Sequence, residues 1–127
     1  MAQAFLDTSC VVSMVLDEPG GARIRRRINR FDELVAAGLL EAELQAVLLR
    51  EGVDLPNPIP AQLTWAIPLR HLGPEIAEVL AAGYLRGADC WHLATALYVA
   101  GDDPASLHFL TLDERQATVA SALGFAT

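Results

Sequence analysis

Short apolar runs alternate with longer segments of helical pattern along this chain of 127 residues. Because strands that alternate with helices usually form a parallel sheet covered by helices on both faces, the sequence predicts an α/β fold. The expected strands are residues 4–6, 33–37 and 107–112, with a last short strand at 124–126. The expected helices are residues 8–16, 21–30, 39–51, 74–85, 90–100 and 114–123.

Turn and capping residues set the expected ends of these segments. Thr8 or Ser9 is expected to cap the first helix, and Gly52 and Gly101 are expected to end two later ones. Three prolines within residues 54–60 exclude regular structure there. Residues 61–72 show no clear preference for helix or strand.

Length and composition favour a single domain over residues 1–127, since a chain of this length buries enough surface for one core. No apolar run approaches the roughly 20 residues of a membrane helix, and the N-terminus has no secretory signal pattern. Cys10 and Cys90 lack a metal-like spacing and are expected to be buried, reduced thiols, with a disulfide as the less favoured alternative. These features predict a cytoplasmic protein.

The charge distribution is uneven. The net charge of −7 argues against nonspecific binding of nucleic acid over the whole surface. All nine basic residues are arginines, however, and five of them share the stretch RIRRRINR: Arg23, Arg25, Arg26, Arg27 and Arg30. The cluster is either the solvated face of a helix or a local patch that contacts a phosphate backbone or an acidic partner.

Three aspartates stand at junctions between elements. Asp7 and Asp113 follow strands, and the carboxyl ends of parallel strands share one edge of the sheet, where ligands bind. Both acids are therefore expected in one cleft. Asp89 precedes the helix at 90–100. Each aspartate also fits the simpler role of a helix cap, in which its side chain accepts a backbone N–H hydrogen bond.

Two glutamates flank the apolar stripe of the helix at 39–51, whose members are Ala37, Leu40, Leu44, Val47 and Leu48. Glu43 lies on one edge of this stripe and Glu41 on the other, and periodicity does not choose between them. A partly desolvated carboxylate there is costly unless it pairs with a cation or metal, although an edge glutamate can also extend to solvent.

Several carboxylates in one cleft have a clear chemical use. Like charges raise one another's pKa, and a divalent cation removes the repulsion. Hard oxygen ligands suit Mg²⁺ or Mn²⁺, and two such ions about 4 Å apart can hold the attacking and leaving oxygens of a phosphodiester. Other catalytic patterns are missing from the sequence: it has no Gly-rich phosphate loop, no paired zinc spacing of its histidines and no G-x-S-x-G motif.

Four segments in this order resemble the PIN-domain family, especially the VapC-type toxins of bacterial toxin–antitoxin pairs. They are FLDTSCVV with Asp7, LLEAELQAVL with Glu43 as the matching acid, LRGADCWHLATAL with Asp89, and FLTLDERQATVASALGF with Thr111 and Asp113. Cys90 and Trp91 depart from the smaller residues usual in the third segment. Residues 54–73 match little, and we expect substrate selection there.

The resemblance implies a three-layer α/β/α sandwich with a mainly parallel sheet and Mg²⁺- or Mn²⁺-dependent hydrolysis of RNA. Asp7, Glu43, Asp89 and Asp113 would bind the metal, and an activated water would cut the phosphodiester to leave a 5′-phosphate and a 3′-hydroxyl. Thr8 or Thr111 would orient a carboxylate by hydrogen bonding to it. The family also implies a homodimer and a small antitoxin that occupies the acidic cleft, where an antitoxin arginine would face these acids.

Two other interpretations stay open. A non-catalytic PIN-like module that binds a protein or nucleic acid is consistent with the net charge and the single arginine cluster. A metal-dependent phosphatase on a similar scaffold is the third, and small phosphoester substrates would separate it from a ribonuclease.

Overall fold

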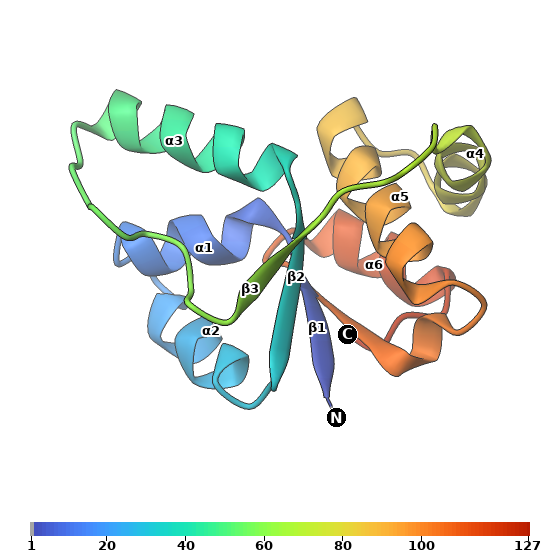
Figure 1. The fold of residues 1–127 in the computed structure, drawn as a ribbon, viewed down its shortest axis with the longest axis horizontal. Helices are drawn as coiled ribbons and strands as arrows, with labels where there is room; N and C mark the ends of the chain where they lie inside the picture. Colours follow the sequence, from blue (N-terminus) through green and yellow to red (C-terminus); the bar gives the residue numbers. More distant parts are fainter. Residues whose placement is uncertain (1) are drawn as a thin grey trace.

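The computed structural model describes residues 2–127 and contains a four-stranded sheet in the order β3-β2-β1-β4. Every neighbouring pair of strands is parallel. In Figure 1 this sheet forms the middle layer, with α1, α2 and α3 on one face and α4, α5 and α6 on the other. The predicted α/β/α sandwich with a parallel sheet is therefore confirmed. The strands are β1 (Gln3–Leu6), β2 (Glu33–Ala37), β3 (Leu63–Ala66) and β4 (Leu107–Leu110).

Six α-helices connect and cover these strands in the described chain, together with a short 3₁₀ helix at Pro104–Ser106. Gly52, in the left-handed backbone region with φ of 67°, ends α3 where the sequence predicts. The helices are α1 (Thr8–Val15), α2 (Gly21–Ile28), α3 (Leu39–Glu51), α4 (Gly73–Ala82), α5 (Gly87–Ala100) and α6 (Glu114–Ala122).

The core consists of two apolar layers, one on each face of the sheet. Successive side chains of a strand point to opposite faces, so Ala4 and Leu6 of β1 join the layer under α1–α3. Phe5 joins the layer under α4–α6, where its ring stacks on that of Phe109 with centroids 5.8 Å apart. Burial on both faces explains why the strands are short, continuous apolar runs.

Three expected details are wrong, and one segment that the sequence leaves open forms a strand. The side chain of Asp7, rather than Thr8 or Ser9, caps α1 by accepting the N–H of Ser9. Helix α5 begins at Gly87, so Asp89 lies inside its first turn and does not cap it. The segment with no clear preference contains β3, which pairs with β2 at the edge of the sheet. The last expected strand is reduced to one bridge between His108 and Ala126.

Two other findings concern the cysteines and the expected absence of membrane helices. Cys10 and Cys90 are buried free thiols, as expected, and burial and the nearby Asp7 raise the pKa of Cys10 to about 12. Within residues 2–127, none of the helices has the length and apolar character that a membrane span requires.

Candidate active site

Five acidic residues line one open cavity of about 370 Å³: Asp7, Glu18, Glu43, Asp89 and Asp113. Asp7 lies between β1 and α1, and Asp113 lies between β4 and α6. Glu43 comes from α3, and Asp89 comes from the first turn of α5. The cavity therefore brings together the four acids that the sequence singles out, although Glu43 and Asp89 belong to opposite helical layers (Figure 1).

Parallel pairing explains why Asp7 and Asp113 lie close together. Strands β1 and β4 are neighbours in register, with Leu6 opposite Leu110. The N–H of Asp7 extends the pairing by donating to the carbonyl of Leu110 at 3.0 Å. The chain therefore leaves β1 and β4 at the same edge of the sheet, as the sequence predicts.

The two glutamates of α3 line different cavities. Glu43 is partly buried and lines the acidic cavity. Glu41 is exposed and lines a different cavity of about 650 Å³, between α3 and the loop at 53–59. Glu43 is therefore the glutamate in position to act with the three aspartates.

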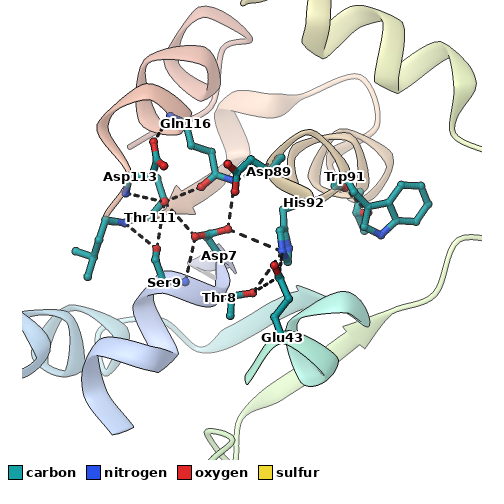
Figure 2. A network of polar contacts seen from close by, with 12 residues as sticks. Asp7, Thr8, Ser9, Glu43, Asp89, Trp91, His92, Thr111, Asp113 and Gln116 are labelled. Atoms are coloured by element: carbon teal, nitrogen blue, oxygen red, sulfur yellow. Dashed lines mark hydrogen bonds and ion pairs between the residues drawn. The ribbon is translucent and has the colours of Figure 1, made fainter. Parts of the chain in front are cut away.

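Asp7 is the most enclosed of the four acids, with 5% of its surface exposed. One carboxylate oxygen, Oδ2, accepts the N–H of Ser9 at 3.1 Å and lies 3.3 Å from the hydroxyl of Thr111. The other, Oδ1, accepts the Nε2–H of Gln116 at 3.2 Å. Figure 2 shows Asp7 at the centre of this network. Its orientation is thus set by the N–H groups of Ser9 and Gln116, with the hydroxyl of Thr111 in contact.

Glu43 is held by two donors from different elements. The hydroxyl of Thr8 donates to Oε1 at 2.7 Å, and His92 Nε2 lies 2.7 Å from the same oxygen. His92 is 1% exposed, and its Nδ1 is buried with no hydrogen-bond partner among residues 2–127. A carboxylate only accepts, so this contact places the ring proton on Nε2.

The pKa of Asp89 is raised above its ordinary value. Burial is the main reason that the pKa of Asp89 is raised, and repulsion from Asp7, Asp113 and Glu43 raises it further. The negative charges of the other three acids therefore reach Asp89 and disfavour its ionised form. A cation bound among them would remove this repulsion.

Asp113 caps α6, because its Oδ1 accepts the N–H of Gln116 at 2.9 Å. Its own N–H donates to the hydroxyl oxygen of Thr111 at 3.1 Å. Thr111 therefore contacts both strand-end aspartates, and Thr8 contacts Glu43. The two threonines selected from the sequence each lie beside an acid of the cavity.

The arginine cluster lies on α2 and on the turn after it. Arg23, Arg25, Arg26 and Arg30 are exposed, whereas Arg27 is half-buried and donates to the carbonyl of Thr127. None of the five is among the described residues that line the acidic cavity. The cluster is thus a separate basic surface, supported by the buried Ile24 and Ile28.

The four acids surround one cavity but do not form a completed set of ligands. In the described part of the chain, no group of three or more His, Cys, Asp or Glu side chains is arranged to hold a metal ion. Three of the acids make internal hydrogen bonds instead: Asp7 with Ser9 and Gln116, Glu43 with Thr8 and His92, and Asp113 with the start of α6. The chemistry of the donors, hard oxygens that repel one another, still fits a divalent cation.

Sequence reasoning missed three polar residues of this site, and one of them is Glu18, an exposed acid that lines the cavity from the segment between α1 and α2. Gln116 is fully buried and contacts Asp7, and Ser9 links the hydroxyl of Thr111 to the N–H of Leu112. Gln116 has one signal in the sequence, a polar residue three positions after Asp113 on a helix. That spacing is also typical of a capping box, so it does not by itself indicate a site.

Comparison with known proteins agrees with this architecture. The profile of the PIN domain family matches residues 4–122. The chain is 31% identical over 134 aligned positions to Ribonuclease VapC46 of Mycobacterium tuberculosis (strain ATCC 25618 / H37Rv). That alignment covers 99% of this chain and 96% of the relative. The similarity extends over all four elements that carry the acids of the cavity.

Proposed function

Because this chain belongs to the PIN domain family, we propose that it is a metal-dependent endoribonuclease, the toxin of a toxin–antitoxin pair. The observation that carries the proposal is the cavity lined by Asp7, Glu43, Asp89 and Asp113. The similarity to a protein named as a VapC ribonuclease, over nearly the whole of both chains, supports the same activity here.

Asp7, Glu43, Asp89 and Asp113 would hold Mg²⁺ or Mn²⁺ in this site. The raised pKa of Asp89 supports the assignment, since it reports burial and repulsion that a divalent cation would offset. When bound, the metal would supply Lewis-acid polarisation of a phosphate and activation of water for attack on phosphorus.

The side chains around the acids prepare them for this role. Thr8 and His92 hold one oxygen of Glu43, which keeps this α3 side chain at the cavity. Ser9 and Gln116 do the same for Asp7. Without a cation, the four carboxylates would repel the phosphates of RNA, so substrate binding and metal binding are expected to be coupled.

The partners follow from the same electrostatics. We expect a cognate antitoxin to block the cavity with a cationic side chain, because a guanidinium pairs well with carboxylates. We also expect a homodimer, as the family implies, and activity in the cytoplasm, where RNA is present and free thiols such as Cys10 and Cys90 persist.

The direct test is RNA cleavage by the purified chain with and without divalent metal. Cleavage is expected with Mg²⁺ or Mn²⁺, with 5′-phosphate and 3′-hydroxyl ends, and none is expected in EDTA. Folded Asp7→Asn should lose at least about 100-fold in rate, since losing groups that only support a metal ligand already costs about 10- to 100-fold. Asp102→Asn is the matched control, because Asp102 is exposed and lies in the turn after α5. Full activity of folded Asp7→Asn would contradict the proposal.

A non-catalytic binding module is the second candidate, and one observation favours it. The acids are engaged in internal hydrogen bonds, and within residues 2–127 no three potential ligands are arranged to hold a metal. A calorimetric titration with Mn²⁺ separates the two candidates. Heat that disappears in Asp7→Asn supports the nuclease, and a titration without heat supports the binding module.

A further inference from the structure

The side chain of Gln116 is fully buried, and both the nitrogen and the oxygen of its amide form hydrogen bonds. Its Nε2 donates to Asp7 Oδ1 and to the carbonyl of Asp89, each at 3.2 Å. Its Oε1 accepts the hydroxyl of Thr111 at 2.7 Å. The residue has no exposed surface, so water does not compete for these bonds. The three partners are thus two acids of the cavity, Asp7 and Asp89, and Thr111, which lies beside Asp7 (Figure 2).

Chemistry fixes the orientation of this amide. The carboxylate of Asp7 and the carbonyl of Asp89 only accept hydrogen bonds, so both must face the NH₂ group. Thr111 has one hydroxyl proton, and its shortest acceptor is Gln116 Oε1 at 2.7 Å, compared with 3.3 Å to Asp7 Oδ2. The same Thr111 oxygen is then free to accept the N–H of Asp113.

The local sequence would suggest a simpler use for Gln116. Asp113 and Gln116 have the spacing of a capping box, in which the second side chain returns to the N–H of the first residue. Only half of that motif is formed, since Asp113 accepts the N–H of Gln116 while its own N–H goes to Thr111. The amide of Gln116 instead reaches Asp7, which is 109 positions away in sequence.

This amide therefore joins three elements that carry acids of the cavity. It belongs to α6, which Asp113 caps, and it contacts the side chain of Asp7 after β1 and the backbone of Asp89 in α5. Moving Gln116 would change the separation of Asp7 from the first turn of α5. In a buried network of this kind, every member fixes the others.

We propose that Gln116 is a positioning residue that holds Asp7 and Asp89 at the separation needed to bind one cation. The inference rests on the proposed function, because it concerns the metal site assigned there. Gln116 would not bind the metal itself. It would act through the Asp7 carboxylate, whose direction it sets, and through the backbone that carries Asp89.

The test is the Mn²⁺ affinity of Gln116→Met, measured by calorimetry well below the melting temperature of the variant. Methionine keeps the length and much of the volume of glutamine but removes both donors and the acceptor. We expect Mn²⁺ binding to weaken about 10- to 100-fold, the usual cost of losing a group that orients a metal ligand. Thr118→Val is the control on the same helix, since Thr118 is exposed and its hydroxyl donates to the carbonyl of Glu114, away from the acids. Its affinity should match the wild type.

The outcomes distinguish this inference from the proposed function. If the wild type binds Mn²⁺ and folded Gln116→Met binds it equally well, Gln116 is only structural and the inference is wrong, while the nuclease proposal stands. If the wild type itself binds no Mn²⁺, both are wrong. Should Gln116→Met fail to fold, Gln116→Asn decides, because its amide is one methylene too short to keep both contacts. Weakened Mn²⁺ binding by folded Gln116→Asn supports the inference, and unchanged binding overturns it.

Discussion

At the scale of single residues, Asp89 shows that this cavity is maintained at a cost in stability. Burial and the charges of Asp7, Asp113 and Glu43 all raise the pKa of Asp89. A raised pKa means that the folded state disfavours the charged carboxylate, although a helix N-terminus normally favours a negative charge. Ionisation of Asp89 therefore opposes folding of the metal-free protein.

Asp89→Asn should consequently stabilise the metal-free protein while removing its response to metal. In EDTA at neutral pH, the variant is expected to melt at a higher temperature than the wild type. Saturating Mn²⁺ should reverse the order, since a ligand at 100 times its Kd that binds only the native state adds about 2.7 kcal/mol. Thermal melts with and without Mn²⁺ check both halves. Asp102→Asn, outside the cavity, should leave the melting temperature in EDTA and its rise with Mn²⁺ unchanged. An Asp89→Asn variant that melts below the wild type in EDTA would contradict this prediction.

The sequence predicts the position of a side chain well where one local rule places it. Asp7 and Asp113 follow strands, and parallel pairing brings strand ends to one edge. The choice between Glu41 and Glu43 depends on how α3 is rotated against its neighbours, which periodicity leaves open. Gln116 was missed because its partners, Asp7 and Asp89, are far away in sequence and its spacing to Asp113 already has a local explanation.

At the scale of elements, the turn between α1 and α2 depends on close backbone contact. Gly21 begins α2, and a Cβ added there would lie 2.5 Å from the carbonyl oxygen of Ser13 in α1. That oxygen already accepts the N–H of Glu18, so it is part of the turn and not free to move away. The two helices can approach this closely only because residue 21 has no side chain.

Gly21→Ala is therefore expected to lower the free energy of unfolding by about 1–3 kcal/mol, the usual cost of forcing an extra methyl group into a packed site. Gly87→Ala is the matched control. Gly87 also begins a helix, but a Cβ there would meet nothing within 4 Å. Chemical denaturation of both variants measures the difference. Equal stability of the two would show that α2 shifts freely away from α1.

Elements were predictable where burial on both faces leaves a continuous apolar run. The limits of β2 and α3 agree with the sequence pattern, since each has a clear end at Ala37 or Gly52. Strand β3 was not predicted because it is an edge strand between prolines, and its residues are only partly buried or exposed. Its conformation comes from backbone pairing with β2, an interaction that no local pattern records.

At the scale of the whole molecule, two regions of opposite charge are separated. The acidic cavity lies at the edge of the sheet where the strands end, whereas the arginine cluster lies on α2. The chain as a whole has a net charge of −7, so a polyanion meets an unfavourable field over much of the surface. A local basic surface would then be the natural place for RNA phosphates to bind, with the cut made elsewhere.

If the cluster contacts RNA, replacing Arg25 and Arg26 by alanine should weaken binding and reduce its dependence on salt. Each lost contact with a phosphate of a single strand lowers the slope of log K against log salt by about 0.7. Fluorescence anisotropy of a labelled single-stranded RNA, in EDTA to prevent cleavage, measures that slope across a salt series. The repulsion from the metal-free acids is the same in the wild type and the variant, so the difference between their slopes reports the arginines. Arg50→Ala is the control, because Arg50 is an exposed arginine on α3 paired with Glu51. An unchanged slope in the double variant would mean that these exposed arginines are a solvated helix face or contact the antitoxin, and that RNA reaches the cavity without them.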